Sequence, residues 1–401
     1  ADDDRRIRRP RRVQVPPRGV RGEKMIYLDH AATTPVDGRV LREMLPYFAE
    51  NFGNADSLHA YGRRGVAAAD AARDEIASLL GAKPQEIYFT SGGTEADNWA
   101  LLGAARANAA RGKRVLVFAA EHHAVLAAAG ALRAEGFAVE EIPSTAEGAA
   151  DLNALEALLR RPACLVAVMA ANNETGVLQP TAEVSRLCRA HGALYFCDAV
   201  QAAGSEKLDV NVPHADLLSI SAHKFYGPKG AGALYIRTGT RMQPLIAGGH
   251  QERGLRGGTT NVPAVVGMAA ALRYAAAERE QNNAKVRALR DAFIARILAS
   301  VAGAQLNGRG ERLPGIANFS FEGIAGAAML QRLDLAGVAA SVGAACSCGS
   351  AQPSHVLLAM GLSPERAAGG VRFSFGKDNT DADAAAAAEE VVRAAKELRR
   401  S

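Results

Sequence analysis

The sequence predicts an α/β protein, with a mostly parallel sheet flanked by helices and a smaller α+β domain. Between residues 61 and 197, short apolar runs alternate with longer helical patterns, as expected for a parallel sheet with helices on both faces. Runs such as 164–169 are apolar at every position, which is typical of strands covered on both sides. A long charged helical pattern at 262–299 follows and predicts the start of the smaller domain.

The elements are expected in a simple order along the chain. After a first strand and a turn at 31–35, helices are predicted at 38–48, 61–80, 94–110, 122–135, 151–159 and 182–191. The strands of the large sheet are predicted at 86–90, 114–118, 138–142, 163–170, 193–197, 215–220 and 232–236. The smaller domain should contain strands at 316–321 and 371–375 and helices at 325–334 and 382–398. We predict a large domain at 40–262 and a small domain made of 25–39 plus 263–401, with a mobile cysteine loop at about 340–352.

Residues 1–24 are predicted to be a disordered basic leader. They contain Pro10, Pro16 and Pro17 and many arginines, with almost no apolar pattern and no apolar region of the kind that a secretory signal needs. Globular patterning begins directly after Met25, so we interpret the segment as an added or upstream-translated leader. Whether it belongs to the native protein is left open by the sequence.

The composition is that of a globular enzyme, with 48% hydrophobic and 22% charged residues among 401. Much of the net charge of +5 comes from the leader, and the nearly neutral remainder has few aromatic residues, so no nucleic-acid partner is expected. No apolar run reaches the roughly 18 residues of a membrane span. Five cysteines in a chain of this length argue against a disulfide framework and favour a cytoplasmic location.

Lys224 is the first candidate for chemistry. It lies in segment 221–230, between two predicted buried strands and before a Gly/Pro turn. Burial lowers the pKa of an amine, which makes the neutral form available for a Schiff base with a carbonyl cofactor. A lone loop lysine is more often a surface residue, so this interpretation depends on the residues around it.

Small and polar residues suggest a phosphate site near this lysine. Gly93 and Thr94 lie between a strand and a helix, where exposed backbone N–H groups and a hydroxyl can surround an anion. Ser221 and His223 would add donors from the lysine loop. In isolation, such a Gly-Gly turn is more often just a helix cap.

Further polar residues are expected at the same edge of the sheet. Asp198 ends an apolar strand, where a protonated pyridine nitrogen would offset the cost of burying a carboxylate, and Gln201 could donate to a ring hydroxyl. His122 follows another strand, and an imidazole can stack on a planar ring and shuttle protons. Asn173 follows a third strand and could hold a cofactor or substrate in plane. An N-cap aspartate and a solvated histidine are the structural alternatives.

Together these motifs resemble the NifS/IscS-type cysteine desulfurases, a class V branch of the fold-type I pyridoxal-phosphate enzymes. The resemblance runs from about Tyr27 to the last helix, and its motifs keep the family's order and nearly its spacing. They lie at 28–35, 90–95, 121–122, 172–176, 198–201, 221–224 and 253–259.

The resemblance implies a role for each cofactor residue. Lys224 would bind pyridoxal 5'-phosphate covalently and later move protons on the substrate carbon. Asp198 would pair with the pyridine nitrogen and Gln201 would bond the ring oxygen. His122 would stack on the ring, with Asn173 beside it.

The resemblance also implies how phosphate and substrate are bound. The expected phosphate ligands are Gly93, Thr94, Ser221 and His223. Thr259 would reach this phosphate from the second subunit of a homodimer. Arg372 would hold the carboxylate of the substrate, a task that suits a bidentate guanidinium, with Asn173 nearby.

By resemblance, Cys346 is the nucleophile that receives sulfur. The small residues around it would allow a mobile loop, and attack would require its thiolate. Cys348 departs from the family pattern, and its role is left open. The two cysteines and His355 are too few and unsuitably spaced for a closed zinc site, so Cys346 is expected to meet metal only as a transient iron–sulfur ligand. The other cysteines, Cys164, Cys188 and Cys197, are expected in the core.

The expected reaction converts L-cysteine to L-alanine and stores the sulfur as a persulfide on Cys346. An iron–sulfur scaffold or another acceptor protein would then take it for iron–sulfur cluster assembly or tRNA thiolation. The alternatives are a selenocysteine lyase or class V aminotransferase on the same cofactor site, or a catalytically silent scaffold of sulfur transfer. The sequence contains no motif that identifies the acceptor.

Overall fold

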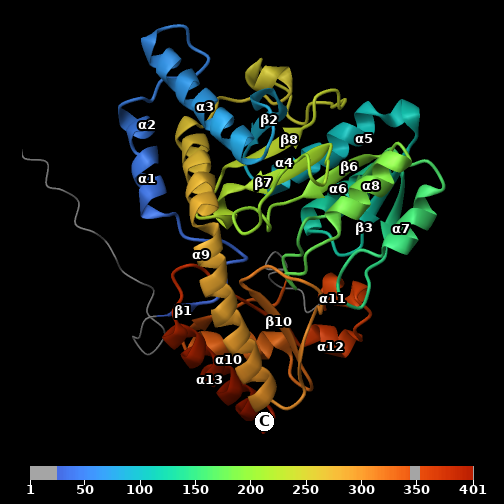
Figure 1. Cartoon of the computed structure of the whole chain (residues 1–401), viewed down its shortest axis with the longest axis vertical. Helices are drawn as coiled ribbons and strands as arrows, with labels where there is room; N and C mark the ends of the chain where they lie inside the picture. Colours follow the sequence, from blue (N-terminus) through green and yellow to red (C-terminus); the bar gives the residue numbers. More distant parts are fainter. Residues whose placement is uncertain (1–24, 344–352, 401) are drawn as a thin grey trace, which may run out of the picture.

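The computed structural model describes residues 25–343 and 353–400 (Figure 1). The predicted leader at 1–24 lies outside the described residues. So do 344–352, which contain Cys346 and Cys348, and the last residue.

A seven-stranded sheet forms the centre of the larger part, in the order β2-β8-β7-β6-β5-β3-β4. Its strands are β2 (Ile87–Thr90), β3 (Arg114–Phe118), β4 (Ala138–Ile142), β5 (Leu165–Ala167), β6 (Leu194–Asp198), β7 (Leu217–Ser221) and β8 (Gly232–Ile236). All neighbours pair in parallel except β8, which is antiparallel to both β2 and β7. The predicted α/β class with a mostly parallel sheet is therefore confirmed.

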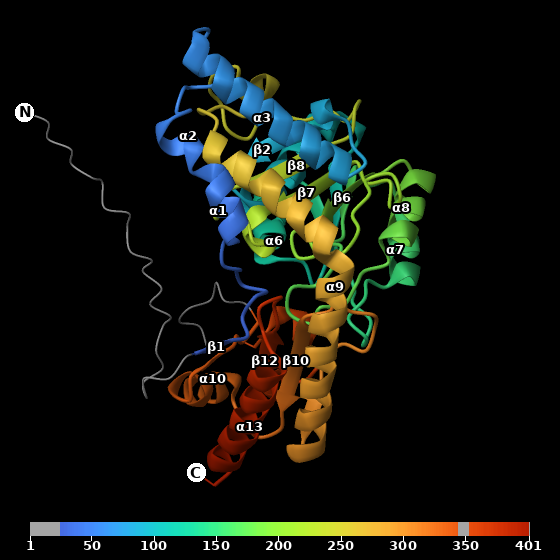
Figure 2. The same ribbon diagram turned by 60° about the vertical axis from the view of Figure 1, so that its left-hand side comes forward.

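Helices cover both faces of this sheet (Figures 1 and 2). One face packs on α3 (Ala60–Leu79), α7 (Leu152–Leu159), α8 (Thr181–Ala190) and the first part of α9 (Val262–Ser300). The other face packs on α4 (Gly93–Asn98), the π-helical turn η2 (Trp99–Gly103), α5 (Ala104–Ala107) and α6 (His123–Ala134). The two hydrophobic clusters explain why the strands are apolar at nearly every position.

Two predicted helices are interrupted in the structure. The helix expected at 94–110 contains the π-helical turn, in which Trp99 donates from Nε1 to the main-chain oxygen of Gln243 at 2.9 Å. Gly103 lies so close to that oxygen that a Cβ atom would be 2.7 Å from it. Tertiary contact with the 243 segment therefore accompanies the wider turn. The helix expected at 38–48 is divided into α1 (Gly38–Met44) and α2 (Pro46–Ala49), since Pro46 has no N–H to continue the first helix.

Helix α9 connects the two parts of the molecule (Figure 2). Its first turns, at Ala264–Leu272, pack in the core of the large sheet, whereas Phe293 and Ile297 pack in a second core. That second core surrounds a three-stranded antiparallel sheet of β12 (Gly370–Ser374), β10 (Ile316–Phe321) and β9 (Ala304–Leu306), covered by α10 (Gly326–Leu335) and α13 (Asp381–Leu398). The first strand, β1 (Ile26–Tyr27), pairs with β11 (Val338–Ala339) beside it. The domain limits given above stay a prediction.

In the part of the chain that the structure describes, no helix is long and apolar enough to cross a membrane. Cys164, Cys188 and Cys197 are buried free thiols, as expected of core residues.

Candidate active site

A cavity of about 450 Å³ lies at the carboxyl ends of the parallel strands. Asp198 ends β6 and Ser221 ends β7, and the loops after β2, β3 and β5 supply further walls. This is where ligands bind in sheets of this type. The predicted residues that line the cavity are Gly93, Thr94, His122, Asn173, Asp198, Gln201, Ser221, His223 and Lys224.

Lys224 is held at the wall of this cavity. It ends the 3₁₀ turn η4 (Ala222–Lys224), which directly follows β7. Its Nζ donates to the main-chain oxygens of Ala31 at 2.5 Å and Ala32 at 3.0 Å. The turn that carries these oxygens is itself attached to the lysine loop, because Thr34 donates from Oγ1 to the oxygen of His223 at 2.8 Å. The amine is therefore fixed between two segments far apart in sequence.

Asp198 is a buried carboxyl group beside the lysine, 5% exposed. Its Oδ1 accepts a hydrogen bond from the backbone N–H of Val200 at 2.9 Å. Burial raises the pKa of Asp198, and Lys224 acts in the opposite direction. Burial and the charge of Asp198 also raise the pKa of Glu121. Such a group of carboxyls favours a cationic partner in the cavity.

Asp97 is a cavity residue that sequence reasoning missed. It is almost fully buried and accepts a 2.6 Å hydrogen bond from the hydroxyl of Ser219. Burial and the neighbouring Asp198 raise its pKa well above the ordinary value. The helical spacing was a usable signal: Asp97 comes four residues after Gly93 in α4, so the two share one face of the helix.

Two imidazoles in the cavity wall are neutral at pH 7. Burial, with a smaller effect of Lys224, lowers the pKa of both His122 and His223 to about 4. Nδ1 of His122 accepts from the backbone N–H of Ala124 at 3.2 Å, which places the ring proton on Nε2. His223 Nδ1 lies 3.1 Å from Thr33 Oγ1. A neutral ring of this kind can lie against a planar ligand without adding charge.

The cavity retains hydrogen-bonding groups for a ligand. Among the described residues, Gln201 Oε1 and Ser221 Oγ are buried without a partner, and both residues line the cavity. Unsatisfied buried polar atoms are costly and call for a ligand or water. At Gly93 a Cβ atom would lie 2.8 Å from Val200 Cγ2, so any other residue would displace the Val200 side chain in the cavity wall. These features suit a ligand with an acidic group, a hydrogen-bonding edge and a basic nitrogen.

Arg372 is buried beside the cavity and does not line it. Its Nη2 forms an ion pair with Asp29 at 2.9 Å, and its Nη1 donates to the main-chain oxygen of Asn173 at 2.8 Å. Nε is buried without a partner among the described residues. The arginine is therefore attached to a wall residue, and its binding of a substrate carboxylate stays a prediction.

The remaining predicted site residues are not brought into the cavity. Thr259 is exposed on its own chain and does not line the cavity. Cys346 lies outside the described residues. Within residues 25–343 and 353–400, no group of three or more metal-ligating side chains is present. The roles given to these two residues stay predictions.

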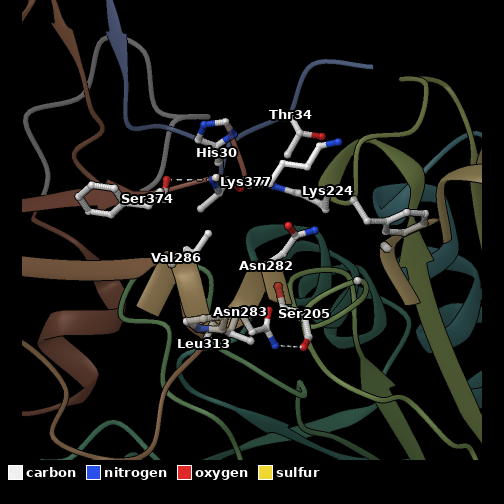
Figure 3. Close-up of a pocket in the computed structure, with 18 of the residues that line it drawn as sticks. His30, Thr34, Ser205, Lys224, Asn282, Asn283, Val286, Leu313, Ser374 and Lys377 are labelled. Atoms are coloured by element: carbon white, nitrogen blue, oxygen red, sulfur yellow. Dashed lines mark hydrogen bonds between the residues drawn. The ribbon is translucent and has the colours of Figure 1, made fainter. Parts of the chain in front are cut away.

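A second, smaller cavity lies between the two parts of the molecule, with Lys224 among its lining residues (Figure 3). It measures about 90 Å³ and is lined by residues of both parts of the molecule, among them His30, Asn282 and Lys377. Lys224 and Gln201 line both cavities. Burial lowers the pKa of His30 to about 4, and its Nδ1 is buried without a partner among the described residues. Sequence reasoning did not find this cavity, because no motif marks a space between two domains.

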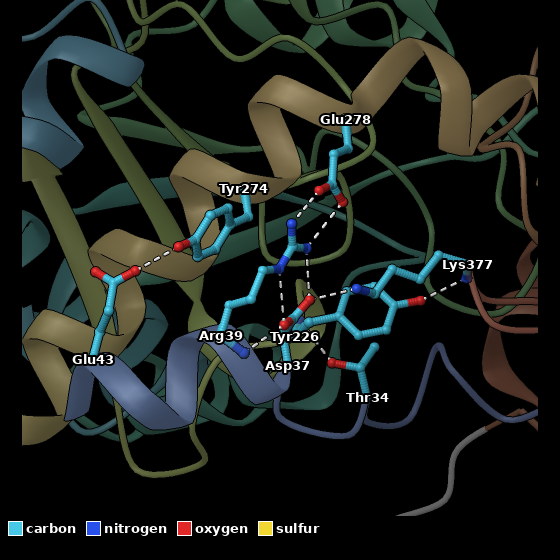
Figure 4. Close-up of polar contacts among 8 residues, drawn as sticks. All are labelled: Thr34, Asp37, Arg39, Glu43, Tyr226, Tyr274, Glu278 and Lys377. Carbon is cyan, nitrogen blue, oxygen red and sulfur yellow. Dashed lines mark hydrogen bonds and ion pairs between the residues drawn. The ribbon is translucent and has the colours of Figure 1, made fainter. Parts of the chain in front are cut away.

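A polar network joins the segments that surround this second cavity (Figure 4). The carboxylate of Asp37 accepts from the side chains of Arg39 and Lys377, and Arg39 also pairs with Glu278 of α9. Arg39 first, and Lys377 second, hold the pKa of Asp37 well below its usual range. The backbone N–H of Lys377 donates to the hydroxyl of Tyr226, two residues after Lys224, at 2.8 Å. The network thus connects the lysine loop to both parts of the chain.

The chain is similar to known proteins over nearly its whole length. The family model for aminotransferase class-V matches residues 26–386. A protein named cysteine desulfurase IscS from Clostridium botulinum (strain Hall) is 44% identical over 363 residues, which cover 90% of this chain and 91% of the relative. A cysteine desulfurase from Gluconacetobacter diazotrophicus is 45% identical over 363 residues, covering 89% and 90% of the two chains.

Solved structures agree with these relatives. A structure named NifS-like protein superposes with a TM-score of 0.86 at 36% identity and covers 92% of this chain and 98% of its own. DndA from Streptomyces lividans gives a TM-score of 0.75 at 38% identity, covering 87% and 99%. These enzymes use pyridoxal 5'-phosphate, whose phosphate, ring oxygen and basic nitrogen are the groups that the cavity suits. The chain belongs to the aminotransferase class-V family and is a pyridoxal-phosphate-dependent cysteine desulfurase.

Proposed function

We propose that the enzyme converts L-cysteine to L-alanine and transfers the sulfur through a persulfide on Cys346 to an acceptor protein. The observation that carries this proposal is the cavity in which Lys224, Asp198, Gln201, Ser221 and His122 meet. Bound pyridoxal phosphate supplies an electron sink that weakens the bonds around the captured amino acid's carbon atoms.

The residues of this chain supply binding and proton transfer. Lys224 Nζ binds the cofactor and later moves a proton on the substrate carbon. Asp198 keeps a proton on the pyridine nitrogen, because its buried carboxylate is stabilised by that positive charge. Arg372 holds the substrate carboxylate, and the thiolate of Cys346 attacks the sulfur atom of the captured cysteine. An S–S bond forms as the C–S bond breaks, and the carbon keeps the electron pair and takes up a proton, which leaves alanine. His122, neutral with its proton on Nε2, can donate that proton at the cavity wall.

The substrate part of the proposal is supported by one solved relative. The structure titled "SspA in complex with cysteine" is 32% identical, with a TM-score of 0.78, and covers 88% of this chain. Cysteine is accordingly proposed as the amino acid for this chain too. The discriminating assay measures alanine and sulfide from L-cysteine, alanine and selenide from selenocysteine, and keto acid formation by transamination.

We further propose a homodimer in which Thr259 reaches the partner's cofactor phosphate. Exposed apolar side chains gather between residues 41 and 66, and Leu58 is 92% exposed. Such a run of apolar surface favours a protein–protein contact. The loop that carries Thr259 is attached to this stretch by a 2.7 Å hydrogen bond from Gln251 Nε2 to Asp56 Oδ2. A second copy that packs on residues 41–66 would therefore lie beside Thr259.

A subunit experiment tests the dimer. Sedimentation should give twice the chain mass for the wild type and the single-chain mass for Leu58→Asp combined with Phe48→Asp. Hybrid dimers of one Lys224→Ala chain and one Thr259→Ala chain should contain one intact and one doubly impaired site, and so keep activity. A Thr259 that acts in its own chain would leave both sites impaired. A monomeric wild-type enzyme would contradict this part of the proposal.

The sulfur-transfer part is tested with cysteine variants. Cys346→Ala should lose sulfide and alanine formation, and Cys348→Ala is expected to keep it. Full activity of Cys346→Ala would refute the nucleophile assignment, and a protein that binds an acceptor without the cofactor would instead be a silent scaffold. We propose a cytoplasmic iron–sulfur scaffold or tRNA-thiolation protein as acceptor, with Cys346 at most a transient iron–sulfur ligand. Transfer of labelled sulfur to captured partners identifies which.

A further inference from the structure

The carboxyl group of Glu174 contacts both ends of the segment that carries Cys346. Before the segment, Gly343 packs so tightly on it that a Cβ atom would lie 2.4 Å from Glu174 Oε2 and 2.8 Å from Cδ. After the segment, the hydroxyl of Ser354 donates a hydrogen bond to the same oxygen, Oε2. Gly343 and Ser354, which flank residues 344–352, therefore both lie beside a single carboxyl oxygen.

Glu174 itself is firmly placed. The residue is only 1% exposed. Its backbone N–H donates to Asn172 Oδ1 at 2.9 Å, and its backbone oxygen accepts from Asn318 Nδ2 at 3.2 Å. Burial raises the pKa of Glu174, and the hydrogen bond from Ser354 opposes that shift. Burying a carboxyl group costs free energy unless hydrogen bonds or a nearby opposite charge compensate for the lost hydration.

The two ends have further attachments near the cavity. Ser341 and Arg372 exchange backbone hydrogen bonds of 3.0 and 2.6 Å, and Arg372 donates to Asn173. On the other side, His355 Nε2 lies 2.9 Å from the backbone oxygen of Glu121, and its ring centre is 4.5 Å from that of His123. Both ends are thus joined to neighbours of the cavity wall.

We propose that Glu174 is a positioning residue for sulfur transfer, which holds the two ends of segment 344–352 together and so places Cys346 relative to the substrate. The inference rests on the role proposed for Cys346. Glu174 does not line the cavity, so it acts through the segment and not on the reacting atoms.

Two substitutions at Glu174 separate its charge from its shape. Glu174→Ala removes the acceptor of the Ser354 hydroxyl, whereas Glu174→Gln keeps an acceptor oxygen and the volume. Misplacement of a reacting group by about 1 Å can cost about 100-fold, so we expect kcat to fall about 10- to 100-fold in Glu174→Ala. Glu174→Gln should recover most of this loss. KM for cysteine and the visible absorbance of the lysine-bound cofactor should stay at wild-type values in both.

A second readout does not depend on turnover. In cofactor-free protein, iodoacetamide should alkylate Cys346 faster in Glu174→Ala than in the wild type, because both ends lose their contact with the Glu174 carboxyl group. Peptide mass analysis reports this at Cys346 itself.

Ser354 offers a matched pair with a control. Ser354 and Ser363 each cap a short helix, α11 (His355–Ala359) and α12 (Pro364–Ala368), and only Ser354 donates to Glu174. Ser354→Ala should lower single-turnover persulfide formation on Cys346, whereas Ser363→Ala should leave it unchanged. The double variant Ser354→Ala/Glu174→Ala should form persulfide no more slowly than Glu174→Ala alone, because both substitutions remove the same hydrogen bond.

The outcomes are distinguishable. Reduced persulfide formation with unchanged KM in Glu174→Ala and Ser354→Ala, rescued by Glu174→Gln, supports the positioning role. Wild-type persulfide formation and wild-type alkylation in Glu174→Ala, or equal losses in Ser354→Ala and Ser363→Ala, overturn it. Absence of persulfide on Cys346 in the wild type would instead refute the proposed function.

Discussion

Arg372 donates a 2.8 Å hydrogen bond to the main-chain oxygen of Asn173, a residue of the cavity wall around Lys224. The guanidinium also pairs with Asp29 at 2.9 Å, so it is anchored from two sides. A buried arginine held in this way can present its remaining N–H groups to a carboxylate at the edge of the cavity.

Arg372→Lys should raise KM for cysteine. A lysine cannot reproduce the fork of the guanidinium, and hydrogen bonds to charged groups contribute about 1.5–3 kcal/mol, or about 10- to 100-fold in affinity. Steady-state kinetics with cysteine measure the change. Arg290→Lys is the control, because Arg290 is also buried and bonded to an aspartate and a backbone oxygen, Leu313 O, away from the cavity. Equal KM values in the two variants would contradict the assignment.

Asp198→Asn should weaken cofactor binding. The amide cannot stabilise a protonated ring nitrogen as a carboxylate does, and we expect a loss of about 10- to 100-fold in cofactor affinity. Visible absorbance after gel filtration measures how much cofactor is retained. Asp216→Asn changes a partly buried carboxylate that accepts from Tyr195 N at 2.8 Å outside the cavity, and it should retain the cofactor fully. Full retention in Asp198→Asn would be evidence against the pairing.

Gly93→Ala should reduce cofactor affinity by about 10-fold or more, because the new Cβ atom would meet Val200 Cγ2 at 2.8 Å in the cavity wall. Titration of cofactor-free protein with pyridoxal phosphate measures this. Gly130→Ala in α6 is the matched change: a Cβ atom there meets nothing within 4 Å, and the helix should gain about 0.5–1 kcal/mol. Unchanged affinity in Gly93→Ala would mean that the phosphate is bound elsewhere.

Stability should fall as the pH falls from about 6.5 towards 4. The pKa of buried His30 is lowered to about 4, whereas in the unfolded chain it has the ordinary value near 6.5. Between these values the unfolded chain binds a proton that the folded chain does not, so acid favours unfolding. The free energy of unfolding should therefore be about 2 kcal/mol lower at about pH 5 than at about pH 8 because of this one group.

Urea unfolding of His30→Asn at these two pH values measures that contribution. Between these two pH values, the free energy of unfolding of the variant should fall by about 2 kcal/mol less than that of the wild type. His191→Asn, at an exposed histidine, should follow the wild type. The same pH dependence in all three proteins would show that His30 titrates normally.

Most of the fold could be predicted because the signals were local. Strands β3, β4, β8 and β10 begin and end at the predicted residues, since their apolar runs are bounded by polar residues and turns. The π-helical turn at Trp99 was not predictable, because it is accompanied by contact with Gln243, which lies far away in sequence. Local propensity contains no information about such a contact.

The candidate site divides in the same way. The residues of the strand-end motifs, such as Asp198 and Ser221, were expected together because parallel strands end at one edge of the sheet. Glu174 and the second cavity were missed, since each depends on how separate segments pack. Asp97 was also missed, although its helical spacing from Gly93 was a usable signal. The positions of Thr259 and Cys346 relative to the cofactor depend on a second copy or on undescribed residues, so they stay predictions.

The central claim is that Lys224 is the residue that binds the cofactor. Borohydride reduction of the purified enzyme, followed by peptide mass analysis, locates the cofactor on one lysine. The account predicts the pyridoxyl-phosphate mass on the peptide that contains Lys224, and its loss in Lys224→Ala. Modification of Lys229, which also lines the cavity, or of no lysine at all would contradict it.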